Sequence, residues 1–338
     1  MSTISLNFLK IIMFDILDVI SSGSTEPDVA HDFSPVMIIY RDGRAKRLVG
    51  NEIVPPSLDP KSNVLSKDVV YSQEENLTSR LFLPNNINPN KKLPLLLYFH
   101  GGGFGLETPF SPTYHSYLNT LVAESQIIAI SVDYRRIPEH PIPILYGDSW
   151  AAVKWAASHA DGDGPEEWLN SHADFNKVFF AGDSAGANIA HHMAMRYGEE
   201  RLVGVNLIGI ILVHPFFWGK DPIANEVDVG ETIRELMETI WRCACPTTSG
   251  CDDPLINPMN DPKLPRLGGN KVLAAAAGKD VLRDRGRLYC ETLKNNGWGG
   301  MVEFMEAKEE VHVFHLSNPT CENAVAMLRK IVSFIHEE

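Results

Sequence analysis

A serine flanked by glycines is the strongest chemical signal in this 338-residue sequence. Gly182-Asp183-Ser184-Ala185-Gly186 directly follows the apolar run Val178 to Ala181 and precedes a stretch of helical character. The G-x-S-x-G pattern alone is weak, because a chain of this length shows it by chance about one time in ten. A serine on a sharp strand-to-helix turn, however, is pushed out of the sheet, and the helix N-terminus behind it stabilises developing negative charge. This context makes Ser184 a candidate nucleophile.

The second signal is a run of glycines, His100-Gly101-Gly102-Gly103-Phe104, at the end of the apolar run Leu93 to Phe99. A phosphate-binding loop is the alternative interpretation, but the Lys-Ser/Thr that would follow in such a loop is missing. Consecutive glycines leave backbone N–H groups unshielded by side chains, and such donors can bind an oxyanion. The backbone N–H of the residue after the nucleophile would add a further donor.

A serine nucleophile needs a general base, and the base needs an acid that orients it. When the nucleophile lies on such a turn, the three residues follow in the order Ser, Asp/Glu, His. Asp280 and Asp284 compete for the acid, because both follow the apolar run Val272 to Ala277. Catalytic groups of such sheets lie at the carboxyl ends of strands, which favours the nearer Asp280. Asp284 is expected to cap a helix that begins near Arg285.

Two histidines compete for the base in Val311-His312-Val313-Phe314-His315. His312 comes first after the acidic loop that precedes it, and we expect it to be the base, with His315 packed in the interior. His191 and His192 lie on the helix after the nucleophile, where we expect helix-surface or packing roles.

The elements that must position these residues alternate between strand and helix. Runs that are apolar on both faces are typical of buried parallel strands, and they occur at Leu93 to Phe99, Ile127 to Val132, Val178 to Ala181, Ile208 to Val213 and Val272 to Ala277. Shorter strands are expected at Met37 to Tyr40, Val69 to Tyr71 and Leu81 to Leu83. Helices are expected at Tyr114 to Glu124, Tyr146 to Ser158, Ala187 to Tyr197 and Glu322 to Glu337. This alternation predicts an α/β fold with a mostly parallel sheet and helices on both faces.

Two segments do not fit that rhythm. Phe216 to Asp253 is rich in helix formers and lacks a strand, so it could lie over the end of the sheet as a cap. Leu6 to Ile20 is apolar near helical spacing, but Lys10, Asp15 and Asp18 interrupt it and it is too short to span a bilayer. We expect an amphipathic helix packed on the protein's own surface, with organelle targeting as the alternative. With no internal repeat or long linker, residues 1–338 are expected to form one domain.

Composition excludes several classes of protein. The chain is 44% hydrophobic and 22% charged, which does not fit a collagen-like or disordered class. Its formal net charge of -13 and the lack of a basic stripe argue against nucleic-acid binding. The five cysteines show no zinc-binding spacing and are expected to be free thiols in a reducing compartment. We therefore expect a cytoplasmic protein with no metal, no cofactor and no stable membrane insertion.

The motifs resemble the hormone-sensitive-lipase branch of the α/β-hydrolases. This resemblance is carried by His100 to Phe104, by Asp133-Tyr134-Arg135 with Pro138-Glu139, and by Gly182 to Gly186. The plant carboxylesterase class is resembled more widely, from about Ser34 to the C-terminus. The segments that carry this wider resemblance are Phe110-Ser111-Pro112-Thr113-Tyr114-His115, His172-Ala173-Asp174-Phe175 and Gly186-Ala187-Asn188-Ile189-Ala190-His191-His192.

The resemblance implies the α/β-hydrolase fold and a set of site residues. It implies Ser184 as nucleophile, Asp280 as acid and His312 as base. The oxyanion donors that it implies are Gly102, Gly103 and Ala185, within the motif that begins with His100 and Gly101. It also implies a helical cap made from the N-terminal segment 1–35 and the insertion 216–253.

These expectations together predict a serine carboxylesterase that hydrolyses small-molecule esters through an acyl-enzyme. Two alternatives come from the same resemblance. Gibberellin receptors share the fold as binding proteins but have lost the catalytic histidine, so His312 beside Ser184 argues against a receptor. Enzymes of the 2-hydroxyisoflavanone dehydratase type eliminate water with similar machinery but commonly carry Thr at the nucleophile position, so Ser184 favours hydrolysis.

Overall fold

A single large sheet accounts for the apolar runs of the sequence. The computed structural model describes residues 28–88 and 91–337, and in these its nine strands pair in the order β12-β11-β10-β9-β7-β8-β6-β5-β4. The strands are β4 (Leu58–Asp59), β5 (Val64–Ser72), β6 (Leu77–Pro84), β7 (Leu93–Phe99), β8 (Ile128–Asp133), β9 (Ala173–Asp183), β10 (Leu207–Val213), β11 (Lys271–Ala277) and β12 (Met301–Ala307). Neighbours from β12 to β8 pair in parallel, and β6, β5 and β4 complete the sheet in antiparallel pairing. The prediction of a mostly parallel sheet is confirmed.

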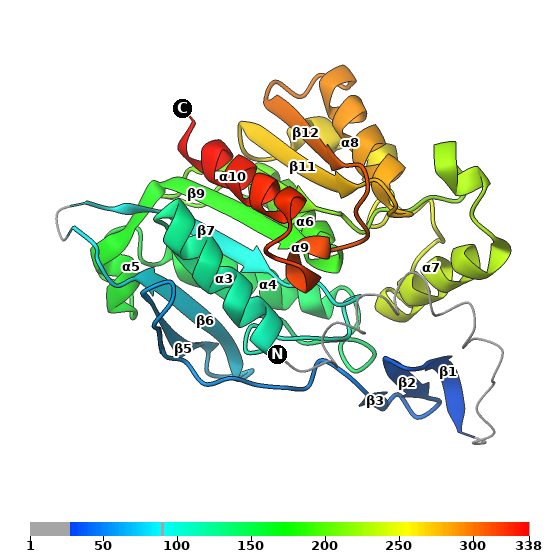
Figure 1. Cartoon of the computed structure of the whole chain (residues 1–338), viewed down its shortest axis with the longest axis horizontal. Helices are drawn as coiled ribbons and strands as arrows, with labels where there is room; N and C mark the ends of the chain where they lie inside the picture. Colours follow the sequence, from blue (N-terminus) through cyan, green and yellow to red (C-terminus); the bar gives the residue numbers. More distant parts are fainter. Residues whose placement is uncertain (1–27, 89–90, 338) are drawn as a thin grey trace.

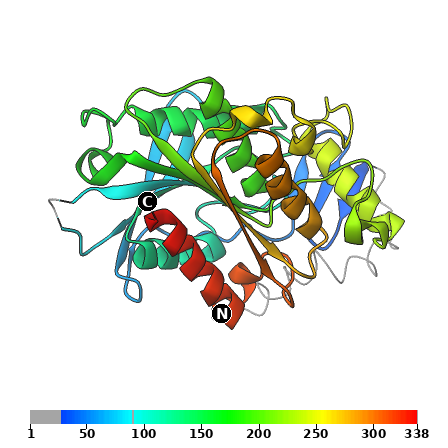
Figure 2. The same cartoon turned by 90° about the horizontal axis from the view of Figure 1, so that it is seen from above.

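Helices cover both faces of this sheet, as predicted (Figures 1 and 2). One face carries α3 (Pro112–Ser125), α9 (Phe314–Ser317) and α10 (Glu322–His336). The other carries α4 (Ile144–Ala157), α6 (Ala185–Glu199) and α8 (Arg283–Asn295), while the short α5 (Glu167–His172) directly precedes β9. Apolar side chains from each group of helices form a separate hydrophobic cluster with the facing side of the sheet. The central strands are therefore buried on both faces, which explains why they are apolar without alternation.

Two smaller parts lie at the carboxyl end of the parallel strands. A small antiparallel sheet contains β1 (Val29–Phe33), β2 (Met37–Tyr40) and β3 (Ala45–Arg47), so the strand predicted at Met37 is confirmed. The insertion after β10 contains α7 (Glu231–Ala244) and the 3₁₀ turn Ala224–Val227, and Figure 1 shows α7 near the small sheet. Further 3₁₀ turns span Pro258–Asn260 and Leu264–Arg266. The helix expected from Leu6 to Ile20 lies outside the described residues.

The small sheet is attached to the loop that follows the glycine motif. Arg47 at the end of β3 donates through Nε to Gly105 O at 2.6 Å and through Nη2 to Ile137 O at 2.8 Å. The same guanidinium binds Glu139 at 2.7 Å. Because one side chain joins three segments, β1 to β3 have a defined position relative to the glycine loop.

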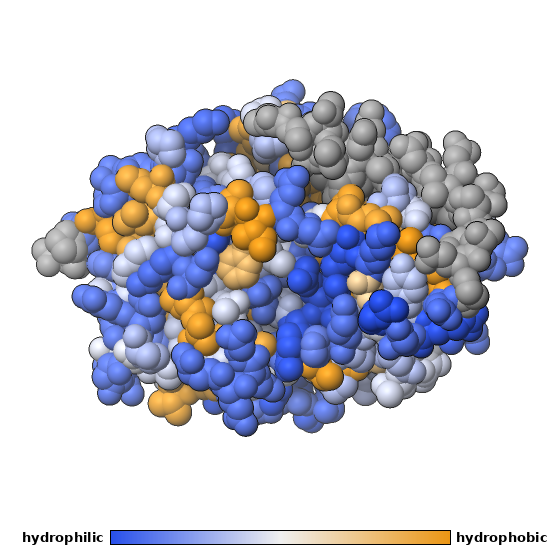
Figure 3. Space-filling view, turned by 90° about the horizontal axis from the view of Figure 1, so that it is seen from below, coloured by the Kyte–Doolittle hydropathy of each residue, from blue (hydrophilic) through white to orange (hydrophobic). Residues whose placement is uncertain are grey.

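The surface seen from below mixes the two kinds of side chain. Figure 3 shows hydrophobic residues on this face in separate groups between hydrophilic ones. Within residues 28–88 and 91–337, no helix combines the length and the hydropathy that a transmembrane segment needs.

Candidate active site

Ser184 lies on the tight turn between β9 and α6. Its backbone adopts φ +52°, in the left-handed region where a side chain is strained. The Ser184 N–H donates to Val213 O at 2.8 Å, and Ser184 O accepts from Phe216 N–H at 3.0 Å. At Gly186, a Cβ atom would lie 2.0 Å from Phe99 O, so only glycine lets α6 approach β7 this closely. The turn therefore has the geometry that the G-x-S-x-G spacing predicted.

His312 and Asp280 complete a hydrogen-bonded chain that begins at Ser184. The distance between Ser184 Oγ and His312 Nε2 is 2.9 Å, and the distance between His312 Nδ1 and Asp280 Oδ2 is 2.6 Å. The three side chains come from the ends of β9, β11 and β12, which lie far apart in the sequence and meet at the carboxyl edge of the sheet. All three residues are buried. The structure thus brings together the three residues selected from the sequence.

The electrostatics of the pair favour the protonated form of His312 and the ionised form of Asp280. Burial alone would lower the pKa of His312, but the charge and hydrogen bond of Asp280, with the charge of Asp183, raise that pKa above its ordinary value. Burial alone would raise the pKa of Asp280, but the charge and hydrogen bond of His312 lower that pKa below its ordinary value. Asp280 is therefore an ionised partner that stabilises the imidazolium form of His312.

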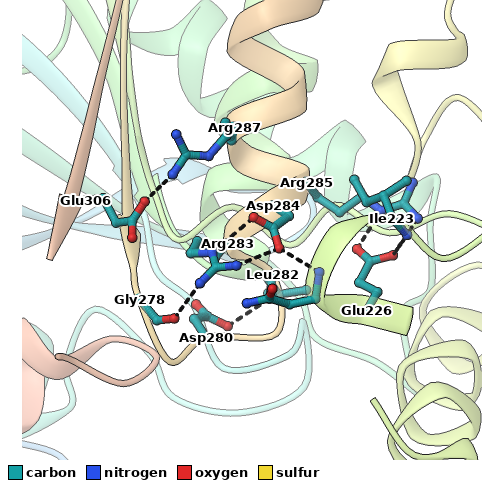
Figure 4. A network of polar contacts seen from close by, with 11 residues as sticks. Ile223, Glu226, Gly278, Asp280, Leu282, Arg283, Asp284, Arg285, Arg287 and Glu306 are labelled. Carbon is teal, nitrogen blue, oxygen red and sulfur yellow. Dashed lines mark hydrogen bonds and ion pairs between the residues drawn. The ribbon is translucent and has the colours of Figure 1, made fainter. Parts of the chain in front are cut away.

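Asp284 has partners other than His312 (Figure 4). Its carboxylate binds the Arg283 guanidinium at 2.8 Å and accepts from the Asn225 N–H at 3.2 Å. Asp280, by contrast, accepts from Leu282 N–H through Oδ1 and leaves Oδ2 for His312. The expectation that Asp284 caps a helix is wrong: α8 begins at Arg283, so Asp284 lies in the first turn, and Leu282 is the cap residue. The carboxylate bonds to the side chain of the neighbouring Arg283 and to the distant Asn225 backbone instead of capping the helix.

The other histidines of these segments have packing roles. His315 is buried against the Tyr117 ring at 5.1 Å between centroids, and burial lowers its pKa to about 3. His191 is bonded through Nδ1 to the Tyr289 hydroxyl at 3.0 Å, and His192 Nε2 donates to Leu255 O at 2.9 Å. Both histidines of α6 are buried rather than on the helix surface. Packing, one of the two roles expected for them, is the one observed.

The glycine loop presents two of its glycines to the space beside Ser184. Gly102 and Gly103 line the same cavity as Ser184. Gly102 has φ +99°, and a Cβ atom there would lie 2.4 Å from Leu106 O, so the loop requires glycine at this position. The Gly101 N–H is already used, because it lies 2.8 Å from the Tyr114 hydroxyl and 3.2 Å from Asp183 Oδ1.

Asp183, which sequence reasoning did not single out, links the loop to the nucleophile turn. Its buried carboxylate accepts from the hydroxyls of Tyr98 at 2.7 Å and Tyr114 at 2.8 Å, besides the Gly101 N–H. His100 supports the same loop from behind: its ring stacks on Tyr134 at 4.3 Å, and burial lowers its pKa to about 3, so it is neutral. Adjacency of Asp183 to the candidate nucleophile was the available signal, but the tyrosine partners are visible only in three dimensions.

A cavity of about 410 Å³ opens onto Ser184. Its walls come from the glycine loop, the small sheet with the segment before β2, α7, and the loops that carry Asp280 and His312. Apolar side chains in these walls include Phe33, Met37, Phe216, Leu236, Ile240 and Leu316. This volume suits a small organic molecule, and the apolar walls suit one with a hydrocarbon or aromatic part.

One group among the described residues has the side chains that could ligate a metal ion. One atom each of His214, Asp280 and His312 lies within 4.8 Å of the other two. Asp280 and His312 are bonded to each other, and His214 Nδ1 accepts from the Val313 N–H at 2.8 Å. A metal ion at this place would have to displace the bond between Asp280 and His312, so these two side chains suit proton transfer better.

The site has a serine on a strand-to-helix turn, and an aspartate and a histidine reach this serine from later strands of the parallel sheet. This arrangement defines the α/β-hydrolase class. A family model described as alpha/beta hydrolase fold matches residues 96–316. The chain belongs to this family.

Individual relatives extend the match to most of the chain. A probable carboxylesterase 7 of Arabidopsis thaliana is 50% identical over 313 residues, which are 91% of this chain and 99% of that protein. A 2-hydroxyisoflavanone dehydratase of Glycine max is 42% identical over 316 residues, 91% of this chain and 99% of that protein. Among solved structures, a thermostable carboxylesterase cloned from a metagenomic library is 26% identical, with a TM-score of 0.68 over 83% of this chain and 90% of that one.

Proposed function

We propose that this protein is a serine carboxylesterase that hydrolyses small-molecule carboxylic esters. The observation that carries the proposal is the chain Ser184 Oγ, His312 Nε2 and Nδ1, and Asp280 Oδ2, with distances of 2.9 and 2.6 Å. A serine hydroxyl is a weak nucleophile until a base within hydrogen-bond distance takes its proton. Relatives named as carboxylesterases support the same chemistry.

The reaction follows from these roles. Ser184 Oγ attacks the ester carbonyl carbon while His312 Nε2 takes the hydroxyl proton, and Asp280 stabilises the resulting imidazolium. The carbonyl oxygen becomes an oxyanion, which the N–H groups of Gly102, Gly103 and Ala185 bind. Ala185 opens α6, and first-turn N–H groups have no partner within their helix. His312 then returns the proton to the leaving alcohol.

Hydrolysis of the acyl-enzyme repeats these steps with water. His312 takes a proton from water, whose oxygen attacks the acyl carbon, and the second tetrahedral intermediate uses the same three N–H donors. The intermediate collapses as Ser184 Oγ regains its proton from His312, and the carboxylic acid leaves. No step requires a cofactor or a metal ion.

We assign the substrate cover to a cap on a single α/β-hydrolase domain. Residues 28–35 and the insertion 216–253 supply Phe33, Leu236 and Ile240 to the walls of the cavity that Ser184 also lines, which supports their role in the cap. Segment 1–35 as a whole was expected there, and its first 27 residues lie outside the described part. The cap selects esters by the fit of their apolar part.

We place the protein in the cytoplasm. All five cysteines lie in the described part of the chain and all are free, which fits a reducing compartment. Cell fractionation followed by immunoblotting tests this placement, and failure to detect this protein in the cytosolic fraction would contradict it.

Elimination of water is the second candidate function, because a relative named 2-hydroxyisoflavanone dehydratase is 42% identical. One experiment separates the two candidates. The purified protein is incubated with p-nitrophenyl acetate, with p-nitrophenyl octanoate and with a 2-hydroxyisoflavanone, alongside Ser184→Ala. Carboxylesterase function predicts hydrolysis of at least one ester, which Ser184→Ala loses. Dehydration without ester hydrolysis would favour the second candidate, and no turnover of either kind would favour a binding protein.

The same comparison of wild type with Ser184→Ala can identify the natural ester in a mixture of metabolites. Wild-type protein and Ser184→Ala are incubated with a metabolite extract, and mass spectrometry compares the two. Metabolites that are consumed only by the wild type, with a matching acid and alcohol produced, identify the substrate.

A further inference from the structure

His214 lies between the strand that carries the nucleophile and the strand that precedes the acid. It directly follows β10, which pairs with β9 on one side and β11 on the other. The His214 N–H donates to Ala275 O of β11 at 2.8 Å. The preceding carbonyl, Val213 O, accepts the Ser184 N–H at 2.8 Å. His214 is thus one residue away from the bond that holds the nucleophile turn.

The side chain of His214 reaches the loop that carries the base. Its Nδ1 accepts from the Val313 N–H at 2.8 Å, and Val313 directly follows His312. Both His214 and Val313 have left-handed backbones, with φ +49° and +47°. The rings of His214 and His312 lie 5.6 Å apart between centroids. Since Val313 is 5% exposed, its N–H would otherwise be a buried donor without a partner.

The accepting nitrogen is available whenever the base is in use. Nδ1 must be unprotonated to accept this bond, so the single ring proton of His214 resides on Nε2. His214 is 1% exposed, and burial lowers its pKa well below the ordinary value. The charge of Asp280 opposes this effect, and the neighbouring His312 and His315 reinforce it. His214 therefore stays neutral over the pH range in which His312 titrates.

We propose that His214 is a positioning residue: through its bond to Val313 it holds the backbone next to His312, and so keeps His312 Nε2 within hydrogen-bond distance of Ser184. The inference rests on the proposed roles of Ser184 and His312. His214 is not among the residues that line the cavity, so it acts through the base rather than on the substrate. Displacement of a reacting group by about 1 Å can cost about a hundredfold in rate, which sets the scale of the effect.

Two substitutions separate the bond from the mere filling of space. His214→Asn places an amide oxygen close to the position of Nδ1, and asparagine tolerates the left-handed backbone. His214→Leu fills a similar volume but has no acceptor, and His214→Gly takes its place if the leucine variant does not fold. His191→Leu is the matched control, because His191 is also buried and bonded through Nδ1, but to Tyr289 and away from the loop.

The readouts are kcat and KM for p-nitrophenyl butyrate, the pH profile of kcat/KM, and the rate at which a fluorophosphonate labels Ser184. In that labelling, Ser184 Oγ bonds to phosphorus, fluoride leaves, and His312 takes the proton. We expect His214→Leu to lower kcat and the labelling rate between about tenfold and a hundredfold, with little change in KM. His214→Asn is expected to recover most of both rates, and His191→Leu to retain them even if its melting temperature falls.

Three outcomes would overturn the inference. His214→Leu could keep the wild-type kcat and labelling rate. His214→Asn could lose as much of both rates as His214→Leu, or His191→Leu could lose as much of them as His214→Leu. Failure of the proposed function gives a different result, because the wild-type protein itself would then neither hydrolyse the ester nor be labelled at Ser184.

Discussion

Replacement of Asp280 by asparagine, with Asp284→Asn as its matched control, tests how the acid works. The two aspartates are four residues apart and both are largely buried, but only Asp280 binds His312, at 2.6 Å. An amide that turns its NH₂ group toward Nδ1 would force the ring proton onto Nε2. His312 could then no longer accept the Ser184 proton. In a Ser-His-Asp triad this change lowers kcat by about 10⁴-fold, equivalent to about 5 kcal/mol.

The pH profile of kcat/KM tests the effect of Asp280 on the pKa of His312 independently. In the wild type, Asp280 raises the pKa of His312 against the opposing effect of burial. Because only neutral imidazole accepts a proton, kcat/KM should rise with pH, with an inflection above about 6.5. Asp280→Asn removes the charge and leaves the burial, so the inflection of any residual activity should move to lower pH.

Asp284→Asn should change stability instead of catalysis. It replaces the ion pair with Arg283 and weakens the bond from the Asn225 N–H. We expect the free energy of unfolding to fall by about 1–2 kcal/mol, measured by urea denaturation, with kcat near the wild-type value. Initial rates on p-nitrophenyl butyrate from about pH 5 to 9 decide between the two aspartates. A larger loss of kcat in Asp284→Asn than in Asp280→Asn would refute this reasoning.

Three further substitutions test other parts of the site and fold. Gly102→Ala places a Cβ atom 2.4 Å from Leu106 O at a residue with φ +99°. We therefore expect kcat to fall by about a hundredfold or more while the circular dichroism spectrum is unchanged. Wild-type turnover by this variant would contradict the role of Gly102 as an oxyanion donor. His315→Ala should leave the inflection of kcat/KM in place, because burial keeps the pKa of His315 at about 3, and a displaced inflection would show that His315 takes part in the titration. Arg285→Met leaves Glu226 buried without its 2.6 Å partner, so urea denaturation should show a loss of about 3–5 kcal/mol, and an unchanged midpoint would contradict this estimate.

The sheet was predictable where it is buried on both faces. Leu93–Phe99 and Lys271–Ala277 are buried throughout, so their apolar composition reveals them as strands. Strand β12, Met301–Ala307, was missed because it is an edge strand whose residues are mostly half-buried and include glutamates. Its sequence therefore lacks the continuous apolar run that marks the central strands.

The hydrogen-bonded chain of the site was predictable because the ends of parallel strands share one edge of the sheet. That rule favoured Asp280 over Asp284. His312 was chosen over His315 because it comes first after the acidic loop, without knowledge of the strand β12 that precedes it. The role of Asp284 was mispredicted because α8 begins at Arg283, before Asp284, which places Asp284 inside the first turn, where it binds Arg283 and the distant Asn225 N–H. The walls of the cavity were not predictable residue by residue, because their shape depends on how distant segments pack.

Trapping of the acyl-enzyme tests the central claim most directly. The protein is mixed with p-nitrophenyl butyrate, quenched in acid within the first turnover, and digested for mass spectrometry, with His312→Ala as a parallel sample. Covalent catalysis by the proposed triad predicts one butyryl group on Ser184 of the wild type and far slower acylation of the variant. A butyryl group on another residue, or equally fast acylation of Ser184 in His312→Ala, would contradict it.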